Sequence, residues 1–288
     1  MITDQETNFL YFSELLSKRH SKLFQELKAI LDLQGIKYGL LSDTNDIWCR
    51  DYMPVQVTKN EFVQFSYKPA YLMRYKKYRR IITDSVNTYK TIGINSKISP
   101  IKIDGGNIVK SRNKVIMTER IFSENRRHSK QSLLREIKKL LRVKQVITIP
   151  ECPFDRYGHA DGMIRFVDGV KDEETVLVND FLGESAKFFS KFHRAILRQG
   201  LCPILLPYKA YRNKGDDAKG IYTNYLEIGK TVIYPIYGIK EDGLAHKVFS
   251  RCFGAHIFQI RADEIAREGG VFNCISWNIK KGDVKCRF

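Results

Sequence analysis

Apolar residues recur at helical spacing in three segments of the chain. The first segment runs from about Phe9 to Leu33 and is followed by Gly35, a residue typical of helix ends. The second runs from Ser129 to Leu141, and the third runs from Ser185 to Arg198 and stops before Gly200. These three patterns predict amphipathic helices.

Short apolar runs alternate with these helices along the chain. The first run, Lys37–Leu41, follows the first helix. Eight more runs are predicted to be strands: Phe62–Phe65, Ile108–Met117, Gln145–Ile149, Met163–Val167, Thr175–Val178, Pro203–Leu206, Tyr222–Glu227 and Thr231–Tyr234. Strands that alternate with helices indicate an α/β protein. No Pro/Gly/Ser-rich linker divides the sequence, so we expect residues 1–288 to form a single domain.

Five stretches place unusual polar residues at the edges of apolar strands. They recur at intervals of roughly 50 to 60 residues, which is within the range of repeat architectures. They lie near Trp48–Pro54, Asp104–Val109, Gly158–Phe166, Tyr222–Leu226 and Gly269–Trp277. Because the stretches share little identity, the spacing suggests a repeat without establishing one.

The composition is that of a globular protein, with 43% hydrophobic and 12% aromatic residues. The net charge of +17 fits a solvated surface. The sequence has neither zinc-finger spacing nor an RNA-binding signature, so we do not expect a nucleic-acid partner. The sequence has no apolar stretch of about 18 residues and no secretory signal, so we expect a cytoplasmic protein without a membrane contact. The six cysteines form no Cys-x-x-Cys pair, which argues against a structural zinc or a disulfide framework.

A His-x-Asp pair, His159 and Asp161, lies between two glycines at the entrance of a predicted strand. Residues i and i+2 of a strand share a face, so both side chains can point into one pocket. The alternative is an ordinary turn with an exposed histidine and an aspartate that stabilises the turn. The pattern alone leaves both interpretations open.

Trp48, Arg50 and Asp51 stand close together in an apolar context, which implies buried charges that need partners. A salt bridge between Arg50 and Asp51 would satisfy both charges without any chemistry. In the functional interpretation, Asp51 faces a cationic substrate and Trp48 provides an aromatic wall.

Cys274 follows two glycines, Gly269 and Gly270, and stands among bulky residues. By composition alone an inert buried cysteine is the better interpretation, because a nucleophilic cysteine needs a lowered pKa or a neighbouring base. Its distance along the chain from His159 is no objection, since Cys/His pairs are assembled in space.

Taken together, these segments resemble the agmatine deiminase and bacterial (Porphyromonas-type) peptidylarginine deiminase family of the pentein superfamily. The motifs follow the family's order from Trp48 to Trp277. They are Trp-x-Arg-Asp ending at Asp51, Gly-Gly-Asn at Gly105–Asn107, Gly-His-x-Asp ending at Asp161, Tyr-x-Asn at Tyr222–Asn224, and Gly-Gly-x-x-x-Cys ending at Cys274.

The resemblance implies a pentein-type five-bladed α/β propeller of ββαβ units with pseudo-fivefold symmetry, which would explain the recurring stretches. It implies that Asp51 and Asp161 hold a guanidinium group, that His159 is the acid/base, that Cys274 is the nucleophile, and that Asn224 shapes the pocket. The implied reaction is hydrolytic deimination through a Cys-thiouronium, with agmatine giving N-carbamoylputrescine and ammonia as the first expectation. No metal or organic cofactor is expected, and the relatives suggest a homodimer.

The sequence departs from the family after the first motif, where residues 65–72 and a basic run at 74–80 replace an aromatic, glycine-rich segment. In the peptidylarginine branch, arginines in this region hold a substrate carboxylate. Arg74 or Arg79 in that role would favour arginine or C-terminal peptidyl-arginine as substrate, and a solvated basic loop is the alternative. Two other functions also stay open. The chain could be an amidinotransferase, or a non-catalytic pentein that binds a protein or nucleic acid through its basic surface.

Overall fold

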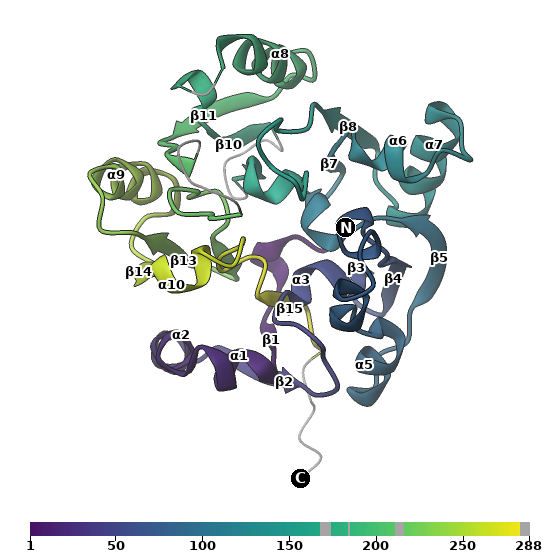
Figure 1. Ribbon diagram of the computed structural model, residues 1–288. Coiled ribbons are helices and arrows are strands. Elements are labelled where there is room, and N and C mark those ends of the chain that lie inside the picture. Colours follow the sequence, from purple (N-terminus) through teal and green to yellow (C-terminus); the bar gives the residue numbers. More distant parts are fainter. Residues whose placement is uncertain (168–173, 184, 211–215, 283–288) are drawn as a thin grey trace.

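Five small β-sheets, each with three strands, form the framework of the structure. The computed structural model describes residues 1–167, 174–183, 185–210 and 216–282 of the chain. The sheets are arranged around a common centre, and the longer helices lie outside them (Figure 1).

Every sheet has the same internal order. Its first strand pairs antiparallel with the second, and the second pairs parallel with the third. The sheets are β3 (Val55–Thr58), β4 (Glu61–Ser66) and β5 (Lys97–Lys102); β6 (Val109–Lys110), β7 (Lys114–Thr118) and β8 (Gln145–Ile149); β9 (Ile164–Phe166), β10 (Thr175–Asn179) and β11 (Cys202–Leu206); β12 (Leu226–Ile228), β13 (Thr231–Ile236) and β14 (Ile257–Arg261); and β15 (Ser276–Ile279), β1 (Phe9–Ser13) and β2 (Lys37–Leu41).

Each parallel pair needs a crossover connection, and helices supply it in every blade. The crossover helices are α1 (Glu14–Arg19) and α2 (Ser21–Leu33); α4 (Ala70–Met73), η2 (Tyr78–Ile81) and α5 (Ser85–Thr91); α6 (Arg120–Glu124) and α7 (Lys130–Leu141); η5 (Phe181–Gly183) and α8 (Ala186–Leu197); and α9 (Glu241–Phe253). The repeating order is therefore ββαβ, and the five-bladed arrangement expected from the resemblance is confirmed.

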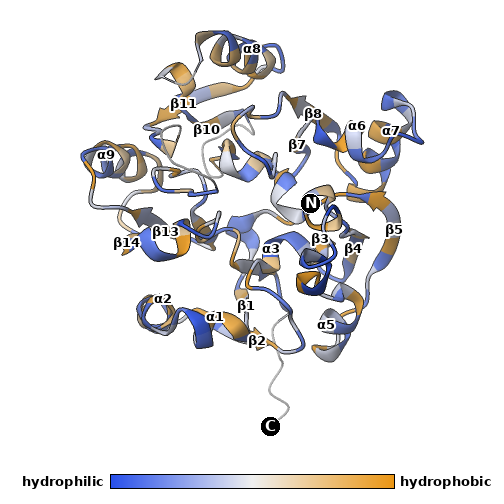
Figure 2. Cartoon of the chain, in the orientation of Figure 1, coloured by the Kyte–Doolittle hydropathy of each residue, from blue (hydrophilic) through white to orange (hydrophobic). Residues whose placement is uncertain are grey.

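The outer helices bury one face and expose the other. Helix α8 buries Phe188, Phe192 and Ile196, which are spaced four residues apart and so lie on one side of the helix. Leu133 and Ile137 of α7 do the same. In Figure 2 these outer helices carry both hydrophobic and hydrophilic residues, as expected for amphipathic helices. This amphipathic spacing is why the sequence predicts α7 and α8 within one residue of their ends.

The first predicted helix is wrong at its start, because Phe9–Ser13 forms strand β1 and the helices begin at Glu14. In β1 the side chains of Leu10, Tyr11 and Phe12 are all buried, and because successive side chains of a strand point to opposite faces, both faces of β1 are covered. A short apolar run that is buried on both faces does not reveal by its periodicity whether it is a helix or a strand.

Two predicted strands are also shorter than expected. Ile108–Met117 is a hairpin of β6 and β7, and only the end of Tyr222–Glu227 joins a strand, β12. The pattern did not predict α9, whose interior contains Gly243 and whose buried face is small. The other predicted strands correspond to strands of the structure.

The five recurring stretches have a common place in the fold. Each one leads into the first strand of a sheet: β3, β6, β9, β12 or β15. Three of these stretches contain a short helical turn before the strand: α3 (Cys49–Tyr52), η3 (Gly105–Asn107) and η4 (Ala160–Gly162). The recurrence in the sequence therefore reflects the loops that the blades send to the centre of the ring.

The N-terminal turn η1 (Asp4–Glu6) contributes a buried ion-pair network that joins several blades. Asp4 lies 2.7 Å from the Arg165 guanidinium and 3.2 Å from the Lys110 ammonium, and it accepts a hydrogen bond from Asn278. These partners come from β9, β6 and β15. None of the helices in the described part of the chain combines the length and the apolar composition needed to cross a membrane.

Candidate active site

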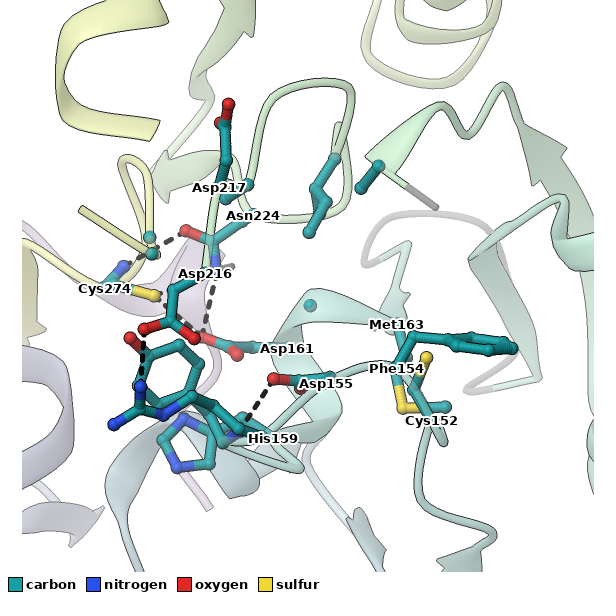
Figure 3. Close-up of a pocket in the computed structure, with 18 of the residues that line it drawn as sticks. Cys152, Phe154, Asp155, His159, Asp161, Met163, Asp216, Asp217, Asn224 and Cys274 are labelled. Atoms are coloured by element: carbon teal, nitrogen blue, oxygen red, sulfur yellow. Dashed lines mark hydrogen bonds and ion pairs between the residues drawn. The ribbon is translucent and has the colours of Figure 1, made fainter. Parts of the chain in front are cut away.

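Four of the predicted site residues come together from the segments that precede β9, β12 and β15. Cys274, Asp161, His159 and Asn224 lie around one end of a cavity (Figure 3). Asp51, at the end of α3, lines the same cavity. All five side chains are buried, with between 3% and 8% of each residue exposed.

Asn224 holds the loop that carries Cys274. Its Oδ1 accepts hydrogen bonds from the backbone N–H groups of Val271 (3.2 Å) and Cys274 (3.3 Å). Its Nδ2 lies 3.1 Å from the Cys274 sulfur. The Tyr222–Tyr225 segment stays outside the sheet, so Asn224 can fix both the backbone and the sulfur of Cys274.

The two glycines before Cys274 permit a close approach to aromatic side chains. Gly269 has φ +104°, and a Cβ on it would lie 2.5 Å from the Tyr157 hydroxyl. A Cβ on Gly270 would lie 2.7 Å from the Trp48 ring and 3.0 Å from the Cys274 Cβ. Only glycine fits such contacts without a shift of the neighbours.

Asp161 is oriented by two amides beside the sulfur. Its Oδ2 accepts hydrogen bonds from Asn273 Nδ2 (2.6 Å) and Asn224 Nδ2 (3.2 Å). The same oxygen lies 3.8 Å from the Cys274 sulfur. The carboxylate is therefore fixed where it can hold a guanidinium group against the thiol.

His159 lies between two other carboxylates. Its Nε2 lies 3.0 Å from Asp104 Oδ2, and its Nδ1 lies 3.5 Å from Asp51 Oδ1. The Gly106 backbone N–H donates to Asp51 Oδ1 at 2.9 Å. With Asp104 bound to Nε2, the Nδ1 side of the ring faces Asp51, the residue expected to hold the substrate.

The carboxylates around His159 decide its charge. Burial alone would lower the pKa of His159, but Asp51, Asp104 and Asp161 outweigh burial and raise that pKa to about 10. Burial raises the pKa of Asp51, and the charge of His159 acts in the opposite direction. At neutral pH His159 is therefore an imidazolium that can donate a proton.

The Cys274 thiol is neutral in the free site. Burial raises the pKa of Cys274 well above its usual range, and the carboxylates of Asp161 and Asp51 raise it further. A cation bound between those carboxylates would cancel their effect. The geometry therefore favours a site in which the substrate itself activates the nucleophile.

The cavity has two chemically different ends. Trp48 forms part of the wall at the catalytic end, where a planar cation would lie against its ring. Cys152, Phe154 and Met163 lie on the other side, away from Cys274 in the view of Figure 3.

Two interpretations from the sequence are not supported by these positions. Arg50 does not pair with Asp51: it donates to the Asn273 carbonyl (3.2 Å) and to Asn278 Oδ1 (3.0 Å). Arg74 is exposed at the end of α4, stacks over its neighbour Tyr75, and is not among the residues that line the cavity. Arg74 points to solvent because the short helix α4 buries Leu72.

Three residues of the site were not predicted. Asp104 stands directly before the Gly105–Asn107 motif, and Asn273 stands directly before Cys274, so their positions beside motifs are the only sequence signal. Tyr71 packs edge-on against Tyr157, with 5.1 Å between the ring centroids, and the centroid of its ring lies 6.4 Å from that of His159. Tyr71 belongs to the segment that replaces the family's aromatic stretch.

A scan against protein-family models matches residues 14–279 to the Porphyromonas-type peptidyl-arginine deiminase family. The chain belongs to this family. The family match places the chain among hydrolases that act on the C–N bonds of linear amidines. A search of the curated proteins gives no match.

Solved structures of pentein-fold deiminases share the fold of this family member. An agmatine deiminase from C. jejuni superposes with a TM-score of 0.78 at 19% identity, covering 98% of this chain and 96% of that one. An agmatine deiminase of Enterococcus faecalis gives 0.75 at 16% identity, covering 97% and 95%. DDAH from Pseudomonas aeruginosa gives 0.57 at 11% identity, covering 95% and 99%. At these identities the likeness concerns the fold.

Proposed function

We propose that this peptidyl-arginine deiminase family member deiminates a guanidino substrate through a covalent thiouronium on Cys274. We further propose that the substrate is agmatine, which would give N-carbamoylputrescine and ammonia. The observation that carries the proposal is the position of the Cys274 sulfur, 3.8 Å from a buried carboxylate that is fixed by two amides.

The reaction begins when Asp51 and Asp161 bind the N–H groups of the planar guanidinium. Carboxylates suit this cation because its donors lie in fixed pairs that match their two oxygens. The bound cation offsets the charges that keep the Cys274 thiol neutral, so the thiol loses its proton to solvent and the thiolate attacks the central carbon.

The protonated His159 then acts as the general acid. It gives its proton to the leaving nitrogen, and ammonia departs while the carbon stays bonded to sulfur as a thiouronium. The neutral imidazole next removes a proton from water, whose oxygen attacks the same carbon. Cleavage of the C–S bond releases the ureido product and restores Cys274, with one water consumed and one ammonia formed.

The charge of the cavity favours agmatine over substrates that end in a carboxylate. The chain carries 49 basic and 32 acidic residues, yet the cavity lining reverses this balance. Among the described residues, six carboxylates, one guanidinium and the His159 imidazolium line it: Asp51, Asp155, Asp161, Asp216, Asp217, Glu268, Arg156 and His159. Agmatine has a second cation at its far end, and this lining would attract it.

The test is an assay of ammonia and ureido product with agmatine, free arginine and a peptide that ends in arginine. We expect agmatine to have the highest kcat/KM, and Cys274→Ala to lower its turnover by at least about 10³-fold. Cys152→Ala is the matched control, because Cys152 is a buried thiol that lines the same cavity on its apolar side.

Each result has a distinct meaning. Turnover of agmatine by Cys274→Ala would exclude the nucleophile assignment. A preference for arginine or the peptide would favour the peptidyl-arginine alternative, and a new guanidine product would indicate an amidinotransferase. If no guanidine is turned over, the proposed function is wrong.

A further inference from the structure

An ion pair joins two sides of the catalytic cavity. The Arg156 Nη1 lies 2.7 Å from Asp216 Oδ2, and both residues line the cavity. Arg156 comes from the connection between β8 and η4, and Asp216 comes from the segment before β12. Asp216 lies on the Cys274 side of the cavity in the view of Figure 3.

Arg156 is the one guanidinium of the cavity lining among the described residues. Its charged group also packs over the Tyr157 ring, 5.5 Å from the ring centroid, which fixes it further at the cavity wall. A guanidinium in this position would be a receptor for a substrate carboxylate, because arginine binds carboxylates through two parallel hydrogen bonds.

Asp216 already supplies a carboxylate to that receptor. Arg156 is exposed and Asp216 is half-buried, with 47% and 29% of their side chains accessible. A carboxylate-bearing substrate would have to displace Asp216 and would then meet the other carboxylates of the lining. A substrate that carries an amine but no carboxylate, such as agmatine, meets neither obstacle.

We propose that Asp216 is a specificity-determining residue that excludes guanidines with a carboxylate at the far end by occupying Arg156. The inference rests on the proposed function, since it concerns the choice among substrates of the same deimination. Selectivity of this kind comes from a penalty on the wrong substrate as much as from contacts with the right one.

Three substrates separate the effects in one experiment. Agmatine and arginine differ only by the carboxylate, and butylguanidine lacks both the amine and the carboxylate. The proteins are the wild type, Asp216→Asn, Arg156→Gln, the double variant, and Glu14→Gln as a control. Glu14 forms a surface ion pair with Lys18 that also measures 2.7 Å, so its substitution changes the net charge equally, away from the cavity.

We expect Asp216→Asn to lower the ratio of kcat/KM for agmatine to that for arginine about tenfold, which corresponds to ~1.4 kcal/mol. The kcat/KM for arginine should rise relative to that for butylguanidine, because the freed Arg156 binds the carboxylate of arginine. The double variant should lack this gain, since the receptor is absent. Arg156→Gln alone and Glu14→Gln should leave arginine without a gain.

An unchanged ratio in Asp216→Asn would overturn the inference. So would a gain for arginine that persists in the double variant, because the effect would then come from the loss of the Asp216 carboxylate itself and not from a freed Arg156. If wild-type protein turns over agmatine, either result rejects only the role of Asp216. If wild-type protein turns over none of the three guanidines, the proposed function itself fails.

Discussion

His159 is surrounded by carboxylates, and its chemistry follows from that setting. Asp104 bonds its Nε2 side at 3.0 Å, and Asp51 lies 3.5 Å from its Nδ1. An imidazolium stabilised in this way is a proton donor at neutral pH, which suits the first step, the release of ammonia. Asp104 does not face the cavity and acts through His159 as a positioning residue.

Replacing Asp104 should change the pH dependence of the reaction in one direction. The raised pKa of His159 keeps the imidazolium in the free enzyme up to about pH 10, so kcat/KM should fall in alkali as His159 loses its proton. Asp104→Asn removes one stabilising charge and lowers the pKa of His159. The alkaline limb of the pH profile of kcat/KM for agmatine should then move down by about 1 unit. If the alkaline limb does not move, a group other than His159 causes it.

The site residues illustrate what the sequence can and cannot predict. The resemblance predicts Cys274, His159, Asp51 and Asp161, because each stands in a motif of the family, and the structure brings all four together. The resemblance suggests Arg74 as a residue that binds a substrate carboxylate, because it follows the first motif, but Arg74 is exposed to solvent in the structure. The contact between His159 and Asp104 joins residues 55 positions apart, and no local pattern encodes such a pairing.

At the level of elements, three short turns meet at the catalytic centre. The η3 turn packs against both α3 and η4, which carry Asp51 and Asp161. The sequence predicts the outer helices α7 and α8 well because their burial follows a helical period, but these turns have no period. Gly105 and Gly106 of η3 are the visible signal, because a Cβ on Gly105 would overlap the Arg50 backbone of α3 and a Cβ on Gly106 would contact Asp51 and His159.

Gly106 in η3 should not tolerate a side chain. A Cβ there would lie 2.6 Å from Asp51 Oδ1 and 2.7 Å from His159 Nδ1. Gly106→Ala should therefore displace both groups and lower kcat/KM for agmatine by about 10²-fold, as expected for a misplacement of catalytic groups. Circular dichroism should show an unchanged fold. Gly243→Ala, where a Cβ meets nothing within 4 Å, is the control, and equal activities of the two variants would contradict the prediction.

At the level of the whole molecule, the ring is joined on its inside by charged groups. Asp4 pairs with Arg165 and Lys110, whose side chains are only 5% and 8% exposed. Burial would raise the pKa of Asp4, but Lys110 and Arg165 outweigh it and lower that pKa below its usual range. No local pattern predicts this network, since its members lie up to 274 positions apart in the sequence.

Removing the Asp4 carboxylate should destabilise the whole ring. Asp4→Ala leaves two buried cations without this partner and should lower the free energy of unfolding by about 3–5 kcal/mol. Urea denaturation followed by tryptophan fluorescence measures the change. The exposed pair of Glu14 and Lys18 provides the comparison, since Glu14→Ala should cost about 1 kcal/mol or less. Similar losses for the two variants would show that the Asp4 network is not a main contributor.

One sheet joins strands that lie far apart in the sequence: β15 pairs with β1, which pairs with β2. During synthesis, β1 leaves the ribosome before β15 and has to wait for this antiparallel partner while residues 14–275 are made. Cys274 stands two residues before β15, so the nucleophile reaches its place in the same event that closes the ring. A nascent chain that lacks this strand has no assembled catalytic centre, and activity on the ribosome would report the completion of folding.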